Sequence, residues 1–248
     1  MPLVLVTFAA FFLPAEVVLD AHLANWEQAT AKATSYSGKF ELIRTAFPLH
    51  RQHKYSGTLL LMKPKLFRIC IQNMKDREDF EAYIFDGKSL YNYDWKSKTV
   101  TELPVGVELF PGFKMKLLEQ TPVLDLFLNL KTSEVKKRYH IKQFHGDFPN
   151  DVYLDIKPTL AKDKQEFEQL RIALHGPHVK EPLIPYMPAA LWLLKPNGDT
   201  EHWRFHDQEV NVKLDGKVLG TQHFQYEVPK GEGWKIRKMP TNPNLPKQ

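Results

Sequence analysis

Residues 57–103 read GTLLLMKPKLFRICIQ (57–72), FEAYIFDGKSLYNYD (80–94) and SKTVTEL (97–103), three extended runs that are joined by short turns. Asp86-Gly87 places two residues that tolerate positive φ between two apolar runs, which is the strongest local signal for a β-hairpin. Asn197-Gly198 forms a second turn of this kind. The pattern predicts consecutive antiparallel strands in a wide curved sheet, and it does not favour a nucleotide-binding core.

The strands around Asp86-Gly87 are unusually rich in aromatic residues. Tyr83, Phe85, Tyr91 and Tyr93 lie within a few residues of the turn. They supply more aromatic surface than a hairpin needs, so one face of the sheet is expected to pack on something large, either helices or a ligand.

Composition indicates one globular domain. The 248 residues are 43% hydrophobic and 25% charged, which is the range of soluble folded domains and excludes wholesale disorder and multiple membrane spans. The net charge is +5, but the lysines are scattered instead of forming a long basic run. A nucleic-acid footprint is therefore not expected, whereas attraction to an anionic membrane surface or an acidic polymer stays open.

Few residues in the sequence suggest chemistry. Cys70 is the single cysteine and lies in an apolar run, so neither a disulfide nor a cysteine-based zinc cluster is expected. His202, Arg204 and His206 share one face of an expected strand, but no third metal ligand accompanies the two histidines. Phosphate-binding glycine loops and the common hydrolase motifs are absent from the sequence, so we expect no enzyme, no cofactor and no metal.

The N-terminal run LVLVTFAAFFL (3–13) has the length of a secretory apolar region, although no Lys or Arg precedes it. We interpret residues 1–15 as a signal segment, residues 16–240 as a single domain and residues 241–248 as a loose tail. This organisation predicts a protein that is periplasmic or otherwise secreted to the cell envelope.

Two helices and a second series of strands complete the expected domain. Residues 16–33 carry Leu19, Leu23 and Trp26 at helical spacing, and residues 121–129 form a strongly apolar segment behind Thr121-Pro122, a favourable helix start. Alternating residues predict a half-buried strand at 36–42. Six further strands, with no helix among them, are expected at 137–144, 151–158, 166–174, 190–198, 199–207 and 223–228.

The chain resembles the outer-membrane lipoprotein carrier (LolA/LolB-like) superfamily, in particular an uncharacterised bacterial branch of it. The resemblance covers most of residues 18–236. It is carried by segments 57–72 and 97–103 quoted above together with LDAHLANWEQATAKATSYSGKFEL (19–42), FDGKSLYNYD (85–94), TPVLDLFLN (121–129), KPNGDTEHWRF (195–205) and HFQYEVPKGEGW (223–234).

The resemblance implies a mainly β fold, an unclosed antiparallel half-barrel whose concave face is covered by helices and whose apolar cavity receives acyl chains of lipoproteins. Where that family has an arginine before the proline, this chain has Lys63 before Pro64. Lysine keeps the charge but lacks the planar fork of arginine, so the control of a helical lid by Lys63 is an open question.

The leading hypothesis is a lipid- or lipoprotein-binding carrier without covalent chemistry, expected to be monomeric and to have an inner- or outer-membrane protein as a possible partner. The alternative is an interaction or sensing module on the same fold, favoured if side chains fill the cavity. A hydrolase is the third alternative.

We expect a charge at Phe127 to abolish lipid uptake while the sheet stays folded. The expected cavity residues are Tyr36, Phe40, Phe67, Ile69, Tyr83, Phe85, Leu124, Phe127 and Phe224.

Overall fold

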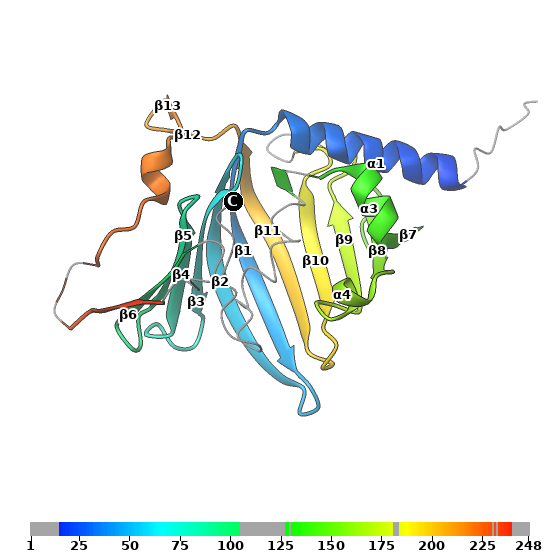
Figure 1. The fold of residues 1–248 in the computed structure, drawn as a ribbon. Coiled ribbons are helices and arrows are strands. Elements are labelled where there is room, and N and C mark those ends of the chain that lie inside the picture. Colours follow the sequence, from blue (N-terminus) through cyan, green and yellow to red (C-terminus); the bar gives the residue numbers. More distant parts are fainter. Residues whose placement is uncertain are drawn as a thin grey trace, which may run out of the picture.

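A single twelve-stranded sheet forms the framework of the protein (Figure 1). The structure is a computed structural model that describes residues 15–104, 127–128, 130–180, 184–229, 231 and 233–239. The strands are β1 (Ser35–Ala46), β2 (Arg51–Met62), β3 (Leu66–Asn73), β4 (Phe80–Phe85), β5 (Ser89–Asp94), β6 (Thr99–Pro104), β7 (Tyr139–Phe144), β8 (Val152–Pro158), β9 (Gln169–Leu174), β10 (Pro188–Leu194), β11 (Thr200–Val210) and β14 (Lys235–Lys238).

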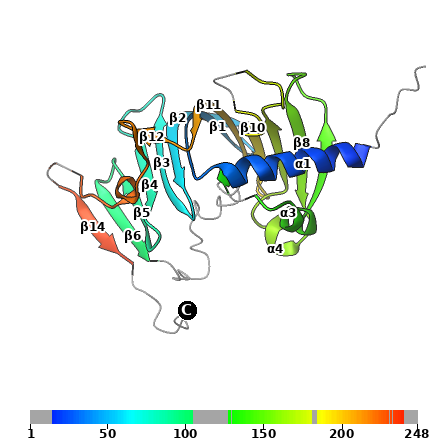
Figure 2. The same cartoon turned by 90° about the horizontal axis from the view of Figure 1, so that it is seen from above.

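The strand order is β14-β6-β5-β4-β3-β2-β1-β11-β10-β9-β8-β7. All neighbours pair antiparallel except β14, which pairs parallel with β6. Viewed from above, the sheet curves strongly and stays open between its two end strands (Figure 2). The predicted unclosed antiparallel half-barrel is confirmed.

The two turns singled out in the sequence connect neighbouring strands. Gly87, between β4 and β5, has a φ of 92°, and Gly198, between β10 and β11, has a φ of 84°. The Asp86 carboxylate accepts hydrogen bonds from the amides of Lys88 and Ser89 at 2.7 and 2.8 Å. A side chain at either glycine would be strained at these φ values, which explains why glycine stands there.

Alternate residues of the strands face opposite sides of the sheet, and each side has its own apolar core. The concave side, here the inner face, carries the inner cluster, whose largest fully buried side chains are Trp26, Tyr36, Phe40, Phe127, Leu23, Leu42, Ile71, Leu90, Leu154, Ile172 and Leu174. The convex side over β2–β6, here the outer face, carries the outer cluster of Ala82, Ile84, Tyr91, Tyr93, Val100, Val212, Leu219 and Phe224.

The helical residues that belong to the inner cluster come from two segments of the chain. Helix α1 (Ala15–Lys32) runs across the sheet in Figure 2 and buries Leu23 and Trp26 in the inner cluster. This confirms the helix predicted at residues 16–33. Of the predicted helix at 121–129, Phe127 and Leu128 are helical and buried in the inner cluster, while Leu124 lies outside the described residues.

Two short helices were not predicted. Helix α3 (Thr132–Arg138) precedes β7, so the strand predicted at 137–144 begins only at Tyr139, and α4 (Ala161–Lys164) interrupts the second series of strands. The expectation that no helix occurs in this series is wrong. Both helices are rich in charged residues and lack an apolar stripe, so the 3.6-residue period that reveals a helix is missing from their sequences.

The strand predicted at 223–228 is also wrong. Residues Thr221–Phe224 form the 3₁₀ helix η1, which follows the small hairpin of β12 (Lys213–Leu214) and β13 (Lys217–Val218). Phe224 is fully buried in the outer cluster, and the ring of Tyr226 stacks on Tyr91 with centroids 4.6 Å apart. The alternating apolar residues therefore cover the outer face and do not pair as a strand.

Gly57 provides a test of the packing between β1, β2 and β3. A Cβ at this position would lie 2.1 Å from the Cys70 carbonyl oxygen and 2.3 Å from Cζ of Phe40. We expect Gly57→Ala to lower the free energy of unfolding by about 1–3 kcal/mol, because backbone and a fully buried ring must both shift. Chemical denaturation measures this change, with Gln52→Ala, at an exposed position of the same strand, as the control. Equal stability of the two variants would contradict this account.

Candidate functional site

Most of the residues predicted to line a cavity are packed against one another in the inner cluster. Tyr36 and Phe127 have ring centroids 4.6 Å apart, and Phe127 and Phe205 have centroids 5.0 Å apart. Phe40 contacts Trp203 in the same way at 4.8 Å. These side chains are buried, so they fill the centre of the half-barrel themselves.

The other predicted residues lie nearer the edge of this core or outside it. Phe67 and Ile69 are buried in the inner cluster, and Phe85, which stacks on Phe67 at 5.6 Å, is half-buried. Tyr83 is half-buried beside them and donates a hydrogen bond to Glu81 at 2.8 Å, and burial raises its pKa. Phe224 belongs to the outer cluster on the opposite face, so its assignment to the same cavity is corrected.

The complete burial of Phe127 changes what a mutation there would report. Its ring is enclosed between Tyr36 and Phe205 and has no exposed surface. A charge at this position would have to be buried without a partner, which destabilises the core itself. A charged residue at Phe127 is therefore expected to destabilise the folded sheet, which corrects the expectation drawn from the sequence.

Lys63 is directly linked to helix α1. Its Nζ donates hydrogen bonds to the carbonyl oxygens of Thr30 at 3.0 Å and Ala31 at 2.9 Å, and its amide donates to the Thr34 carbonyl at 2.9 Å. A cation at the C-terminus of a helix satisfies carbonyls that have no partner within the helix and complements the helix dipole. Burial lowers the pKa of the Lys63 amine, a desolvation cost that the two carbonyl contacts offset.

Further polar contacts hold α1 along its length. On one side, the Thr132 hydroxyl donates to the Leu23 carbonyl at 3.2 Å, and the Thr132 amide donates to the Glu27 carboxylate at 3.2 Å. On the other side, the side-chain amide of Asn25 donates to the Tyr186 hydroxyl at 3.2 Å. The helix is thus fastened to α3 and to the segment before β10 by contacts that water can replace when the helix moves.

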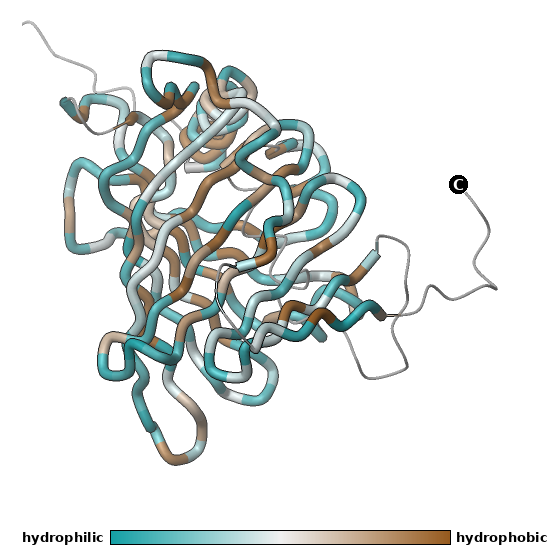
Figure 3. Tube along the Cα trace, turned by 90° about the vertical axis from the view of Figure 1, so that its left-hand side faces the viewer, coloured by the Kyte–Doolittle hydropathy of each residue, from teal (hydrophilic) through white to brown (hydrophobic). Residues whose placement is uncertain are grey.

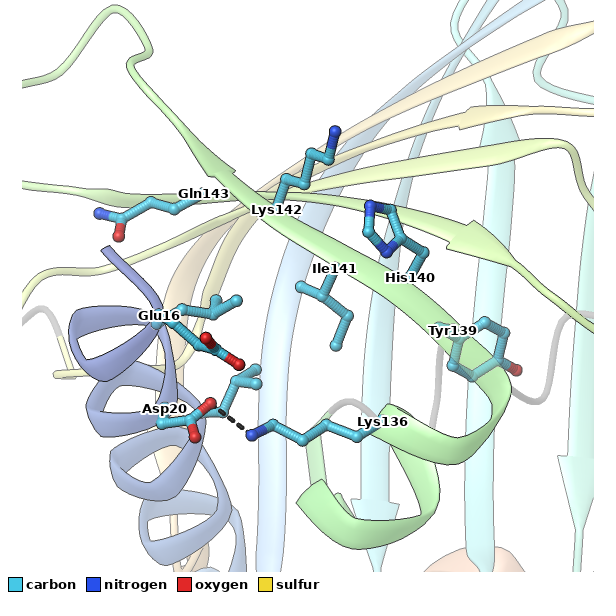
Figure 4. A pocket seen from close by; sticks show the side chains of 10 residues that line it. Glu16, Asp20, Lys136, Tyr139, His140, Ile141, Lys142 and Gln143 are labelled. Carbon is cyan, nitrogen blue, oxygen red and sulfur yellow. Dashed lines mark hydrogen bonds and ion pairs between the residues drawn. The ribbon is translucent and has the colours of Figure 1, made fainter. Parts of the chain in front are cut away.

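A pocket of about 540 Å³ opens between the N-terminal half of α1, helix α3 and strand β7 (Figure 4). Lys136 of α3 reaches across to Asp20 of α1 and forms an ion pair at the side of the pocket, and Ile141 points into the space between the two helices. The residues that line the pocket are Glu16, Leu19, Asp20, Leu23, Lys136, Tyr139, His140, Ile141, Lys142 and Gln143.

The pocket follows the open edge of the sheet. Five consecutive residues of β7, 139–143, line it, although alternate side chains of a strand point to opposite faces. This is possible because β7 is the last strand and, within the described residues, pairs only with β8. The sequence did not reveal this site, since four of its ten lining residues are charged and the site forms only where β7 meets the distant helix α1.

The candidate chemical groups of the sequence do not converge in this pocket. His202, Arg204 and His206 are exposed on one face of β11, and burial, followed by the charge of Arg204, lowers the pKa of His202. Cys70 is half-buried on the outer side of β3, and burial raises the pKa of its thiol. Within the described ranges, no group of three or more His, Cys, Asp or Glu side chains is placed to hold a metal ion.

Among the helices in the described part of the chain, none combines the length and the apolar character needed to cross a bilayer.

No model of a known protein family matches the chain, and no curated protein matches it in sequence. Similar solved structures include a LolA superfamily protein from Nitrosomonas europaea, with 10% identity, a TM-score of 0.42 and coverage of 84% of this chain and 97% of that chain. LprF from Mycobacterium bovis has 8% identity, a TM-score of 0.44 and coverage of 82% and 98%. A chain of the Pseudomonas aeruginosa MucA/MucB complex has 12% identity, a TM-score of 0.41 and coverage of 84% of this chain and 61% of that chain.

The link between Lys63 and α1 leads to a test of how the helix is held. We expect Lys63→Met to lower the free energy of unfolding by about 1 kcal/mol, because the last turn of α1 loses two charge-assisted hydrogen bonds. Hydrogen exchange should accelerate in that turn. Lys65→Met, at an exposed position of the same β2–β3 turn, is the control and should change neither quantity. If both variants behave alike, the Lys63 contacts do not hold the helix.

Proposed function

We propose that the protein binds the acyl chain of a lipid or lipoprotein in the pocket between α1 and β7, and that it acts as a carrier in the cell envelope. The observation that supports this proposal is a pocket with an apolar floor and a charged rim beside a helix that is held by two buried apolar anchors and by several polar contacts. No covalent chemistry is required for such a role.

The apolar floor of the pocket is continuous with the core. Leu23 is part of the inner cluster, and Leu19, Tyr139 and Ile141 pack against it. A volume of about 540 Å³ falls in the range of small-molecule sites in proteins. Each methylene buried here gains about 0.8 kcal/mol, so an acyl chain of moderate length binds without any directed polar contact.

The rim of the pocket carries charges of both signs, with Glu16 and Asp20 on α1 and the basic residues Lys136 and Lys142 on α3 and β7. Lys142 is exposed beside the apolar floor and forms no ion pair among the described residues, and His140 lies next to it on β7. Asp20 is neutralised by its ion pair with Lys136. Lys142 and Ile141 extend from opposite sides of β7 (Figure 4), so a head group of an amphiphile would reach Lys142 only around the open edge of this strand, while the attached chain lies against Ile141.

Helix α1 supplies one wall of the pocket, so its movement would admit or release a chain. Leu23 and Trp26 are its fully buried anchors, Leu19 and Ala29 also pack against the inner cluster, and polar contacts with Tyr186, Lys63 and Thr132 add to them. The apolar run at residues 3–13, which precedes this helix, supports secretion to the envelope.

The alternative, an interaction or sensing module, is supported by a different observation. Tyr36, Phe40 and Phe127 fill the middle of the half-barrel, so the space left for cargo is far smaller than the concave face itself. A filled core suits a protein that presents a surface to a partner. The two functions differ in whether lipid is present in the purified protein.

Lipid extraction therefore decides first between them. The protein is purified without detergent, extracted with organic solvent and analysed by mass spectrometry, and uptake of a fluorescent fatty acid is measured in parallel. Stoichiometric acyl lipid, with affinity for added fatty acids that rises about fourfold for each methylene until the pocket is full, is the expected result. An empty extract together with no uptake would favour the interaction module.

The pocket itself is tested by Ile141→Asp. Ile141 is half-buried at the pocket and lies on an edge strand, so the variant is expected to fold while uptake of the fluorescent fatty acid falls at least ~10-fold, because a carboxylate now meets the chain. Ile236→Asp is the matched control, since Ile236 is an exposed isoleucine on β14, the opposite edge strand. Unchanged uptake by Ile141→Asp would place any lipid elsewhere.

A further inference from the structure

The β1–β2 hairpin projects below its neighbouring strands, at the end of the sheet away from α1 (Figure 1). The end of this hairpin, residues 44–54, is here called the hairpin tip and consists of the turn at 47–50 and the adjoining strand residues. The turn presents large apolar side chains to solvent: Phe47 is 57% exposed and Leu49 is 78% exposed. The lowest turn in Figure 3 is accordingly coloured as hydrophobic. Met74, which is 58% exposed, lies beside the hairpin, where its amide donates to the Lys54 carbonyl at 3.0 Å.

The hairpin tip is positively charged. It contains Arg44, Arg51 and Lys54 together with two histidines, and the chain has neither Asp nor Glu between residues 42 and 75. Arg44 is paired with Glu201 at 3.3 Å, whereas Arg51 and Lys54 are exposed and form no ion pair among the described residues. Two exposed cations, Arg51 and Lys54, thus directly follow the apolar turn along the chain.

Several carboxylates near the tip already accept hydrogen bonds or form ion pairs. Asp199 accepts a hydrogen bond from the Phe47 amide at 2.8 Å, and Glu201 is buried, with Lys195 at 2.7 Å. In the loop after β3, Asp76 accepts from the Glu78 amide and Asp79 accepts from the Asn73 side chain. Glu201 forms its ion pairs with Arg44 and Lys195, so it is not the partner of the exposed cations Arg51 and Lys54.

The hairpin tip is also held in a fixed shape. The bond between the Phe47 amide and Asp199 ties it to the turn between β10 and β11. In that turn, a Cβ at Gly198 would lie 2.8 Å from Cγ of Phe47, so the ring rests against the glycine backbone. The exposed apolar surface is consequently preorganised, and docking it costs little conformational entropy.

We propose that the hairpin tip docks the protein on an anionic lipid bilayer. Leu49 and Phe47 would enter the boundary between headgroups and acyl chains, and Arg51 and Lys54 would contact lipid phosphates. A protein partner fits less well, because a stable protein interface takes about 800 Å² from each partner and its centre is poor in lysine, whereas this surface is a narrow turn flanked by cations. This docking goes beyond the proposed function, since it does not involve the pocket.

The test is sedimentation of the full chain with phosphatidylcholine vesicles that contain or lack phosphatidylglycerol. Binding is expected with the anionic vesicles, weaker binding with the neutral ones, and a decline as salt rises. Leu49→Glu should reduce the partition coefficient at least ~10-fold, and replacing Arg51 and Lys54 by glutamine should reduce it about 5-fold for each cation. Val218→Glu is the control, because Val218 is 73% exposed on the separate β12–β13 hairpin.

Several outcomes would overturn the proposal. The first is that the protein sediments with neither kind of vesicle. The second is that Leu49→Glu binds as well as the unaltered protein. The third is that binding depends neither on headgroup charge nor on salt. The pocket variant Ile141→Asp separates the two proposals, because it should lose fatty-acid uptake and still bind vesicles. If Ile141→Asp loses vesicle binding while Leu49→Glu keeps it, the pocket and not the tip contacts the bilayer.

Discussion

Both faces of the sheet between β2 and β6 are apolar, and the rest of the structure follows from the need to cover them. Adjacent residues such as Leu59 and Leu60, or Tyr83 and Ile84, pack on opposite sides because strand side chains alternate. Side chains of α1 together with Phe127, Leu128 and Leu130 pack on the inner side, and Val212, Leu219, Phe224, Tyr226 and Trp234 pack on the outer side. An antiparallel sheet with only one buried face would need just one of these layers.

The sequence predicted those parts of the fold that depend on local patterns. Asp86-Gly87 and the alternating runs around it indicated the hairpins, and Leu23 and Trp26 indicated the helix over the sheet. The strand predicted around Phe224 was wrong because apolar and polar residues alternate in the same way in a strand and in an extended segment that lies across an apolar face. Only the position of Tyr226 against Tyr91, in the folded protein, distinguishes the two.

The candidate site depends on contacts between distant residues, so little of it could be predicted. Residues Asp20 and Lys136 are 116 positions apart, and neither is unusual by itself in the sequence. Lys63 was recognised through its place before a proline, and the structure shows its contacts with α1, but its role in lid movement stays a proposal. Tyr36, Phe40 and Phe127 illustrate the converse: aromatic residues on a strand face indicate burial, and the pattern cannot tell a packed core from a ligand cavity.

For the proposed carrier function, the packed interior limits the size of a ligand that the protein could hold. A ligand larger than the pocket beside β7 would have to displace Leu23 and Trp26, whose burial against the inner cluster stabilises the closed position of α1 by roughly 1.5–3 kcal/mol for each large apolar side chain. An acyl chain that entered the same space would contact the inner cluster in place of Leu23 and Trp26. Movement of α1 away from the sheet and binding of the chain would then occur together. The helix that closes the half-barrel would thus compete directly with the ligand. In the proposed function, the polar contacts of α1 with Lys63, Thr132 and Tyr186 would add to this apolar burial in holding the helix, each with a smaller free energy because water can replace them.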